Sequence, residues 1–193
     1  MKQAVDLPEE LQSEGSQLFT GFATHWSEPD LETDFSEPLP GSSTDHLTTF
    51  CAFFQSQGWL FTRIKGRDDV VELSIKSNHY VLNCRAFVNR SMDQCAFYSF
   101  APGKVSVGMR VAAVEFIMRA NYGLIIGNLE MDWINGDVRC KTSIDVHGDD
   151  LSIALIQNLV EANVALMDLY LPGLQAVMTG ELTAAAAIAK CEN

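Results

Sequence analysis

The chain has 193 residues, of which 47% are hydrophobic and 20% are charged, and its formal net charge is -12 at pH 7. This length fits one ordinary domain with an appendage and is too short for two large domains. The negative charge disfavours nucleic acid as a partner, and no cluster of lysine or arginine is visible. No apolar run approaches the roughly 18 to 20 residues that span a bilayer, so we expect no membrane insertion.

From the first residues of the sequence and from its cysteines, we expect a cytoplasmic protein without cofactors. Lys2 is followed by polar and acidic residues, which is not the order of a signal peptide. The sequence contains no C-x-x-C, and its five cysteines, an odd number, argue against a disulfide framework or a thiolate zinc site. We expect ordinary, mostly buried thiols at all five positions: Cys51, Cys84, Cys95, Cys140 and Cys191.

Residues 1–44 differ from the rest of the chain in composition. They hold nine acidic residues and one basic residue, a net charge of -8, whereas residues 45–193 hold sixteen acidic and twelve basic residues, a net charge of -4. Stretches such as SEPLPGSSTD favour turns and extended chain. Apolar residues nevertheless recur, at Leu31, Phe35 and Leu39 among others, with a spacing that suits docking on an apolar surface. We therefore expect an acidic arm over 1–44, flexible or docked, and a globular domain over 45–193.

The domain is predicted to begin with a helix and two strands. Residues 45–57 fit a helix that Ser43 or Thr44 caps and Gly58 stops. Its apolar stripe comprises Leu47, Phe50, Cys51 and Phe54. The alternating segments WLFTRIK and VVELSIK then predict an antiparallel pair, with Ile64 opposite Val71 and with Arg63 opposite Glu72 on the other face.

Two further strands, HYVLNCRAFV and QCAFYSF, are separated by the polar loop NRSMD. Carrying the register across this loop aligns Leu82, Cys84 and Ala86 with Ala96 and Tyr98 on the inner face. Four large apolar side chains then point the other way: Phe61, Val81, Phe87 and Phe97. This second face would need a cover, and we expect the N-terminal arm, a helix or a second subunit to provide it.

The segment from Val105 to Gly123 predicts a helix with Val107, Val111, Val114 and Met118 in line. It is apolar nearly all round, so we expect it to be buried on more than one side. A hairpin follows, because Asn135-Gly136 suits a type I′ turn.

In the register of that turn, Glu130 faces Lys141 and Asp132 faces Arg139 on one side of the hairpin. Two carboxylates two residues apart could hold a divalent cation or act as an acid/base pair. A ladder of complementary surface pairs explains the same residues without chemistry and is our prediction. Cys140 and His147 are seven apart, hence on opposite faces of a straight strand, and no catalytic motif is present elsewhere. We predict no enzyme, no catalytic residue and no metal.

A long final helix is predicted after Gly148, with Asp149 or Asp150 as its cap and Pro172 as a bend or end. Its apolar stripe comprises Leu155, Leu159, Ala162, Leu166 and Tyr170, and a weaker helix follows. The polar residues inside the helix suggest hydrogen bonds to a neighbouring element. An alternative is a small-ligand pocket between this helix and the sheet, lined by Trp133, Asn163, Asp168 and Tyr170.

The predicted order is α-β-β-β-β-α-β-β-α(-α), an α+β fold with a mostly antiparallel sheet in two layers. Residues 45–185 resemble the YbjN family of bacterial proteins, whose domain is similar to the type III secretion chaperones. The resemblance rests on FFQSQGW, FVNRSMDQCAFYSF, FIMRANYGLIIGNLEMDWINGDVRCKTS and LVEANVALMDLYLPGLQAVMTG.

This resemblance implies a homodimer with a non-enzymatic part in protein interaction or regulation, and the family is described as sensory transduction regulators. It supplies no catalytic residues. We expect a chaperone-like or adaptor protein that binds itself and another protein, with a ligand-sensing regulatory domain as the alternative. The charged run that family members often carry in the loop at residues 89–96 is reduced here to Arg90 and Asp93.

Overall fold

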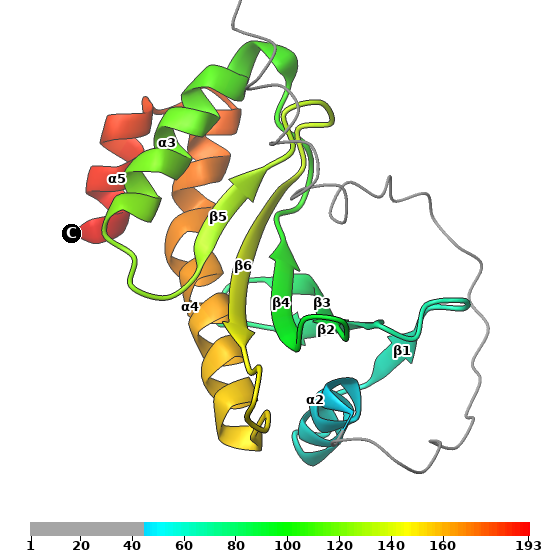
Figure 1. The fold of residues 1–193 in the computed structure, drawn as a ribbon. Helices are drawn as coiled ribbons and strands as arrows, with labels where there is room; N and C mark the ends of the chain where they lie inside the picture. The colour runs from blue at the N-terminus through cyan, green and yellow to red at the C-terminus, as the bar shows by residue number, and fades with distance from the viewer. Residues whose placement is uncertain (1–44) are drawn as a thin grey trace, which may run out of the picture. The chain divides into compact units, whose positions relative to one another are not determined.

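The computed structural model describes residues 45–193, so the predictions for residues 1–44 lie outside the described part of the chain. The element order agrees with the predicted α+β order (Figure 1). The first half comprises α2 (His46–Ser56), β1 (Phe61–Arg63), β2 (Val70–Lys76), β3 (Val81–Asn89), β4 (Gln94–Phe100) and the short 3-10 helix η1 (Val107–Met109). The second half comprises α3 (Arg110–Tyr122), β5 (Asn128–Met131), β6 (Val138–Asp145), α4 (Ile153–Met178) and α5 (Ala184–Glu192).

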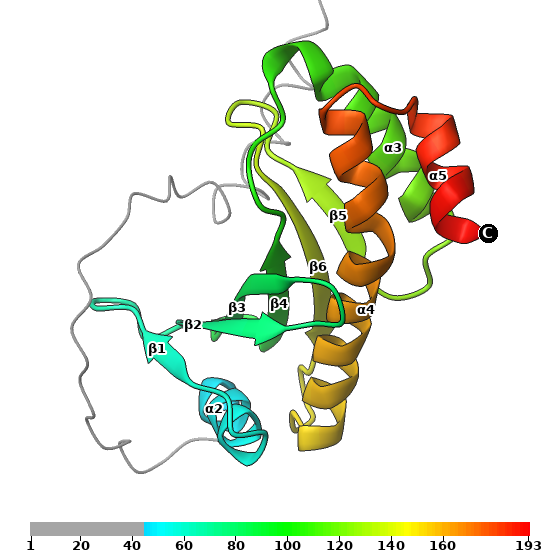
Figure 2. The ribbon, with the colours of Figure 1, turned by 180° about the vertical axis from the view of Figure 1, so that it is seen from behind.

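The six strands form one antiparallel sheet in the order β1-β2-β3-β4-β6-β5. One row of neighbours across the sheet, Leu73, Cys84, Ser99, Cys140 and Leu129, marks the inner face. The next row, Glu72, Arg85, Tyr98, Lys141 and Asn128, marks the outer face. Helices α2 and α4 pack on the inner face, α3 lies beside the edge strand β5, and α5 packs on α3 and α4 (Figure 2). The described helices therefore form a single layer, and the outer face carries none of them.

The N-cap of helix α2 is Asp45, the residue after the predicted caps Ser43 and Thr44. The Asp45 side chain accepts a hydrogen bond from the Leu47 backbone at 3.3 Å. Phe50 and Phe54 are fully buried, as predicted, and the helix gives way to Gly58, whose φ of +70° favours glycine. The stripe and the stop signal were therefore read correctly from the sequence.

Helix α4 differs more from its prediction. Ser152 caps it by accepting a hydrogen bond from the Leu155 backbone N–H, and the helix continues through Pro172 to Met178. Leu159 and Tyr170 are buried as predicted, whereas Leu155, Ala162 and Leu166 are only half-buried. The side that faces the sheet and the other helices instead comprises Ile156, Val160, Asn163, Met167, Leu171, Leu174 and Val177.

Two predicted strand registers are wrong by one residue, which reverses the faces of the strands. Arg63, not Ile64, pairs with Val71, and this shift of one residue turns the side chains of β1 to the opposite face. The turn after β3 holds four residues between the paired Asn89 and Gln94, where the prediction assumed five. The side chains of β4 are therefore also reversed.

The β5–β6 hairpin does not use the predicted two-residue turn. The backbone N–H of Asp132 donates to the carbonyl of Asp137, and the N–H of Gly136 donates to the carbonyl of Asp132, both at 2.8 Å. Gly136 has a φ of +77°, but Asn135 does not share the positive φ that a type I′ turn requires. Glu130 consequently pairs with Arg139 in place of Lys141, a shift of two residues that leaves every side chain on its predicted face.

Candidate functional site

The four residues predicted for the second sheet face divide between the two faces. Phe97 lies on the inner face, fully buried, with its ring centroid 6.3 Å from that of Phe54. Phe61 lies on the inner face too and is half-buried beside the same ring. Their predicted placement on the outer face is wrong because of the two register shifts. Val81, 70% exposed, and the half-buried Phe87 do lie on the outer face.

The outer face combines aromatic rings with cations. The guanidinium of Arg139 lies over the ring of Tyr98 at 4.4 Å, and that of Arg85 lies over the ring of Phe100 at 5.0 Å. Such stacking holds a cation against an apolar surface. Tyr98 is buried and Phe100 is half-buried. This face is thus part apolar and part positively charged.

Only part of the predicted charge ladder of the hairpin is present on the same face, because Asp132 accepts hydrogen bonds from the backbone N–H groups of Ile134 and Asn135 and does not face Arg139. Glu130 accepts hydrogen bonds from Arg139 at 2.8 Å and also pairs with Lys141. Burial alone would raise the pKa of Glu130, but the hydrogen bonds from Lys141, Arg139 and Asn128 together lower it. An ionised carboxylate held by two cations is a structural ion pair and has no proton to exchange near neutral pH.

The four predicted pocket residues have separate surroundings. Asn163 is fully buried, and its amide nitrogen donates to the Phe97 carbonyl at 3.0 Å and the Cys140 carbonyl at 3.2 Å. The Asp168 carboxylate accepts hydrogen bonds from the Ser77 hydroxyl and the Asn78 backbone. The Tyr170 hydroxyl donates to Glu192 at 3.0 Å. The last of the four, Trp133, is 55% exposed on the β5–β6 turn.

An apolar surface that the sequence analysis did not find lies on the outward side of α3. Helix α3 buries Ala113, Phe116, Ile117 and Ala120. The predicted buried row is wrong, because Val107, Val111 and Met118 are 75%, 73% and 64% exposed. The exposed set continues around the following loop and onto the β5–β6 turn, and we call it the α3 surface: Val107, Val111, Met118, Tyr122, Ile125, Ile126, Trp133 and Ile134.

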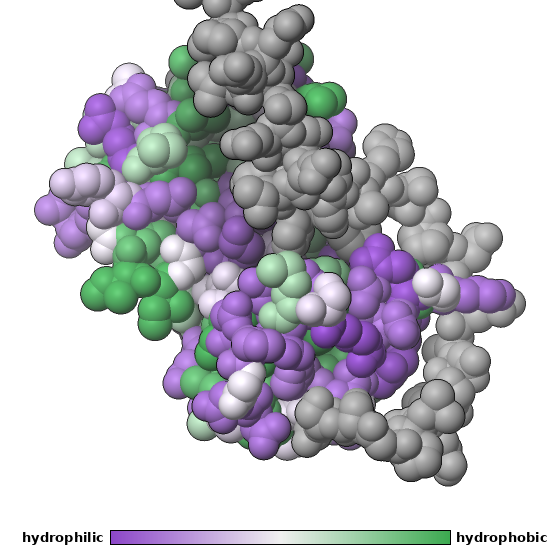
Figure 3. Space-filling view, in the orientation of Figure 1, coloured by the Kyte–Doolittle hydropathy of each residue, from purple (hydrophilic) through white to green (hydrophobic). Residues whose placement is uncertain are grey.

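Part of the α3 surface is visible as a green patch over the loop between α3 and β5 in Figure 3. Tyr122 and Ile125 are 96% and 99% exposed, so these large side chains have almost no contact within the described part of the chain. The segment 105–107 ties the start of the helical segment to the β5–β6 turn, because the Val105 backbone donates to the Gly136 carbonyl at 2.8 Å. The apolar side chains therefore continue from one end of α3 to the other.

The edge of the sheet beside this surface is closed by a side chain. Asn121 donates from its amide nitrogen to the Leu129 carbonyl at 2.9 Å and accepts from the Leu129 N–H at 2.8 Å. The side-chain amide thus takes the place of a neighbouring strand at the centre of β5. An edge strand normally invites pairing with another strand, and Asn121 prevents it at this point.

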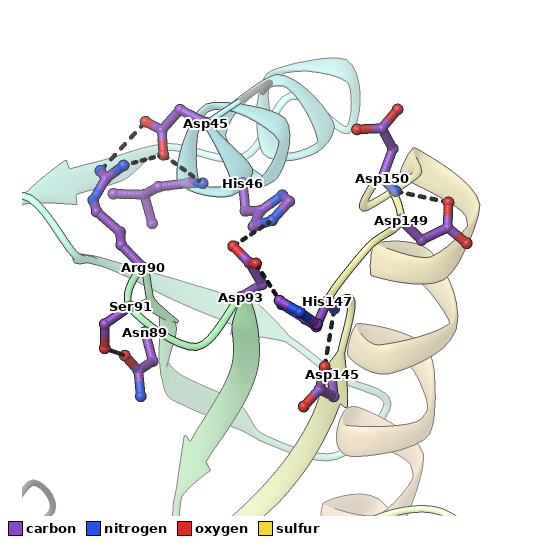
Figure 4. Close-up of polar contacts among 11 residues, drawn as sticks. Asp45, His46, Asn89, Arg90, Ser91, Asp93, Asp145, His147, Asp149 and Asp150 are labelled. Carbon is purple, nitrogen blue, oxygen red and sulfur yellow. Dashed lines mark hydrogen bonds and ion pairs between the residues drawn. The ribbon is translucent and has the colours of Figure 1, made fainter. Parts of the chain in front are cut away.

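A polar cluster joins α2 to the ends of β4 and β6 (Figure 4). Arg90 donates to Asp45 at 2.6 Å, which ties the cap of α2 to the β3–β4 turn. Asp93, in the left-handed region with a φ of +51°, lies between two imidazoles, 3.1 Å from His147 Nδ1 and 4.0 Å from His46 Nε2. His46 is buried, and its Nδ1 has no hydrogen-bond partner within the described residues.

The buried thiols beside this cluster and in the sheet have raised pKa values. Burial raises the pKa of the Cys95 thiol to about 12, with the help of the charges of Asp93 and Asp45. Burial likewise raises the pKa of Cys84 and of Cys140 to about 12. A thiol in this state is no nucleophile near neutral pH. Within residues 45–193, no group of three or more histidine, cysteine, aspartate or glutamate side chains is arranged to hold a metal ion.

No family model matches the chain, and no curated protein matches it. Among solved structures, the chain is similar to YbjN of E. coli, described as a candidate transcription regulator, with a TM-score of 0.49 and 12% identity over 71% of this chain and 91% of that one. It is also similar to a chain of the HopA1–SchA chaperone–effector complex, with a TM-score of 0.43 and 11% identity over 62% of this chain and 87% of that one. The described residues themselves form an α+β fold with a six-stranded antiparallel sheet. These two similarities concern the fold alone.

In residues 45–193, no helix is both long and apolar enough to cross a bilayer.

Proposed function

We propose that this chain is a protein-interaction domain without catalytic activity, of the chaperone-like or adaptor kind, and that it forms a homodimer through the α3 surface. The observation that carries the proposal is the exposure of this surface. Folded monomers rarely expose a contiguous apolar patch beyond a few hundred Å², and larger ones mark contact sites. Large aromatic and aliphatic anchors of this kind supply most of the energy of protein interfaces.

The spacing of the exposed residues favours a helix-to-helix contact. Val107, Val111, Met118 and Tyr122 are four, seven and four residues apart, so they follow one side of the helical segment. The charged pair of Glu115 and Arg119, joined at 2.8 Å, belongs to the same helix and is exposed. An apolar stripe bordered by charge is the pattern of a helix that packs against another helix.

A second copy of the chain fits this stripe because the apolar residues of the stripe lie in both halves of the helical segment. In a two-fold arrangement, each contact is made twice, and residues of one half meet those of the other half. Antiparallel packing about the middle of α3 places the valines near its start against Met118 and Tyr122 of the second copy. Pairing between β5 strands is opposed by Asn121, which leaves the helix side as the route of association.

The ligand-sensing alternative has no comparable support. The amide of Asn163 and the carboxylate of Asp168 are engaged by partners within the domain. A ligand would have to displace these hydrogen bonds, and a buried polar group left without a partner costs about 1 to 3 kcal/mol.

Val111→Asp tests the proposal, with Val81→Asp as a matched control. The two valines are 73% and 70% exposed, so neither change disturbs the core, but Val81 lies on the outer sheet face. Sedimentation velocity over a range of concentrations should show a dimer for the wild type and for Val81→Asp. Val111→Asp should weaken the dimer at least about tenfold, equivalent to about 1.4 kcal/mol. A wild-type monomer at every concentration, or equal dimers in all three proteins, would show that the α3 surface does not mediate self-association.

A further inference from the structure

Arg110, the first residue of α3, is a cation without a partner beside the α3 surface. It is the only arginine of residues 45–193 in this state, because the other six all donate a hydrogen bond. Its side chain is half-buried, and its Nε is buried with no hydrogen-bond partner among the described residues. A buried charged donor without an acceptor is unfavourable, so this position favours an acceptor from outside the chain.

The end of α3 at which Arg110 lies makes its charge less favourable still. The N-terminus of a helix carries a partial positive charge, which disfavours a cation in the first turn. The first turn of α3 contains no acidic residue. Arg119, by contrast, lies in the last turn, where the helix dipole favours a cation, and it is paired with Glu115 at 2.8 Å. Of the two arginines of α3, only Arg110 thus lacks a compensating charge.

The C-terminal end of α3 offers the kind of acceptor that Arg110 lacks. The last carbonyls of a helix have no partner within the helix, and they form the negative end of its dipole. Among the described residues, the two backbone N–H groups that follow α3 both donate to the Asn121 carbonyl, which leaves the carbonyls on either side of it as acceptors. Residues 120–127 contain no charged side chain, so no cation of this segment competes for these carbonyls.

The stripe of the α3 surface is symmetric about its own centre. Val111 and Met118 lie equally far from the midpoint of the helical segment, and so do Val107 and Tyr122. A two-fold axis through this midpoint therefore places Val111 of one copy opposite Met118 of the other, and Val107 opposite Tyr122. In Figure 1, α3 faces the viewer with no other described helix or strand in front of it. A second helix can thus pack along the stripe.

The same axis places Arg110 of each copy beside the last turn of α3 in the other copy. Within one chain, Arg110 and this turn are about 18 Å apart along the helix, which is beyond the reach of the side chain. Arg110 and Arg119 are nine residues apart, or about two and a half turns, so their side chains leave α3 on opposite sides. A two-fold axis brings like sides of two antiparallel helices together, so Arg110 does not meet Arg119 of the other copy.

We propose that Arg110 of one copy donates to the C-terminal carbonyls of α3 in the other copy, and that this contact, made twice, fixes the antiparallel register in which Val111 faces Met118. The inference rests on the homodimer proposed above and adds the group that orients it. Apolar contact supplies area but no direction, whereas a guanidinium needs acceptors at one place. In the dimer, the unpaired donor of the free chain has acceptors and lies at the negative end of a second helix dipole.

Two variants of equal charge test the contact. Arg110→Gln and Arg119→Gln each remove one positive charge from α3, so they change the net charge of the chain equally. Arg110→Gln should weaken the dimer about tenfold, because it removes a hydrogen bond from a charged donor. Arg119→Gln removes only an exposed pair within one helix and should change the dissociation constant less than about twofold. Sedimentation velocity over a range of concentrations measures both constants.

Disulfide trapping tests the register. Cys191→Ser removes the native thiol that is not fully buried, and in this background one preparation carries Val111→Cys and another carries Met118→Cys. Mild oxidation of a mixture should join unlike chains, because the two positions are level in the proposed register. Neither preparation alone should form a covalent dimer. Equivalent positions are about 10 Å apart along the axis, and a disulfide needs Cα atoms within about 7 Å.

A tenfold loss confined to Arg110→Gln, with trapping only in the mixture, supports the proposal. Equal dissociation constants for Arg110→Gln and Arg119→Gln overturn it and leave the homodimer standing where Val111→Asp still weakens the dimer. Trapping in either preparation alone also overturns it, because the copies would then pack in parallel or in another register. A wild-type chain that is monomeric at every concentration removes the homodimer itself, and the inference falls with it.

Discussion

Asn163 is the residue whose replacement tests the packing of α4 on the sheet most directly. It is fully buried, and its amide nitrogen lies 3.0 Å from the Phe97 carbonyl, 3.2 Å from the Cys140 carbonyl and 3.4 Å from the Thr142 hydroxyl. Its amide oxygen accepts a hydrogen bond from the buried Ser99 hydroxyl. One side chain thus joins the helix to the neighbouring strands β4 and β6.

The change Asn163→Ala should lower the free energy of unfolding by about 3.5 kcal/mol. Three buried hydrogen bonds contribute about 1 kcal/mol each, and the Ser99 hydroxyl is left without an acceptor at a further cost of about 1 kcal/mol. The better helix propensity of alanine returns about 0.5 kcal/mol. Asn158→Ala, the same change at an exposed position of the same helix, should be neutral or slightly stabilising.

Urea unfolding followed by circular dichroism measures both changes, and equal m-values would show that the denatured states are alike. Ser99→Ala completes a double-mutant cycle. Because Ser99 and Asn163 bond to each other, the double variant should be more stable than the sum of the two single changes implies, by about 1 kcal/mol. A cost for Asn163→Ala no larger than that of Asn158→Ala, or strict additivity in the cycle, would refute this account of the helix–sheet contact.

Two further predictions concern the hairpin and the cap of α2. Gly136→Ala should lower the stability measured by thermal unfolding more than Gly103→Ala does. Both glycines have a positive φ, a conformation that costs an alanine about 1 kcal/mol. A Cβ at Gly136 would in addition lie 2.3 Å from the Val105 carbonyl, whereas a Cβ at Gly103 meets nothing within 4 Å. Equal costs would contradict the close approach. Burial alone would raise the pKa of Asp45, but the hydrogen bonds to its carboxylate and the charge of Arg90 lower this pKa. The ionised Asp45 therefore contributes to stability above about pH 4, and this contribution is lost as the pH falls further. Asp45→Asn should therefore flatten the loss of stability between about pH 4 and pH 2, and an unchanged acid profile in urea titrations would count against the pairing.

The order of elements was readable from the sequence because the signals that set it are local. The stripe of α2 and the glycine that follows it depend on neighbours three or four residues apart, and both are confirmed. The alternation within β2 and β3 also identified their buried faces, with Leu73 and Cys84 on the inner side. The partners of Asn163 could not be named, because the main-chain carbonyls of Phe97 and Cys140 are defined only by the folded sheet.

Sheet faces, by contrast, depend on whether the number of residues in each connection is odd or even. A turn of four residues at 90–93, where five were assumed, reverses β4 and carries Phe97 into the core. A change of one residue before Val71 does the same to β1 and Phe61. At the β5–β6 hairpin the error was two residues, so Glu130 stayed with the cations despite the wrong partner. The local preferences of the strand residues do not reveal how many residues a connection contains.

Helix α3 shows why the proposed contact surface could not be found from periodicity. Its apolar residues surround the helix, so two different stripes satisfy the same spacing, and the row with Val111 and Met118 was assigned to the core. The choice between the stripes is made by packing: Phe116 lies with its ring centroid 6.2 Å from that of Tyr170, and the small Ala113 and Ala120 let α3 approach its neighbours closely. Large side chains then remain on the outward side. A helix that is apolar on both sides thus offers two surfaces, and the sequence alone does not say which of them packs within the domain.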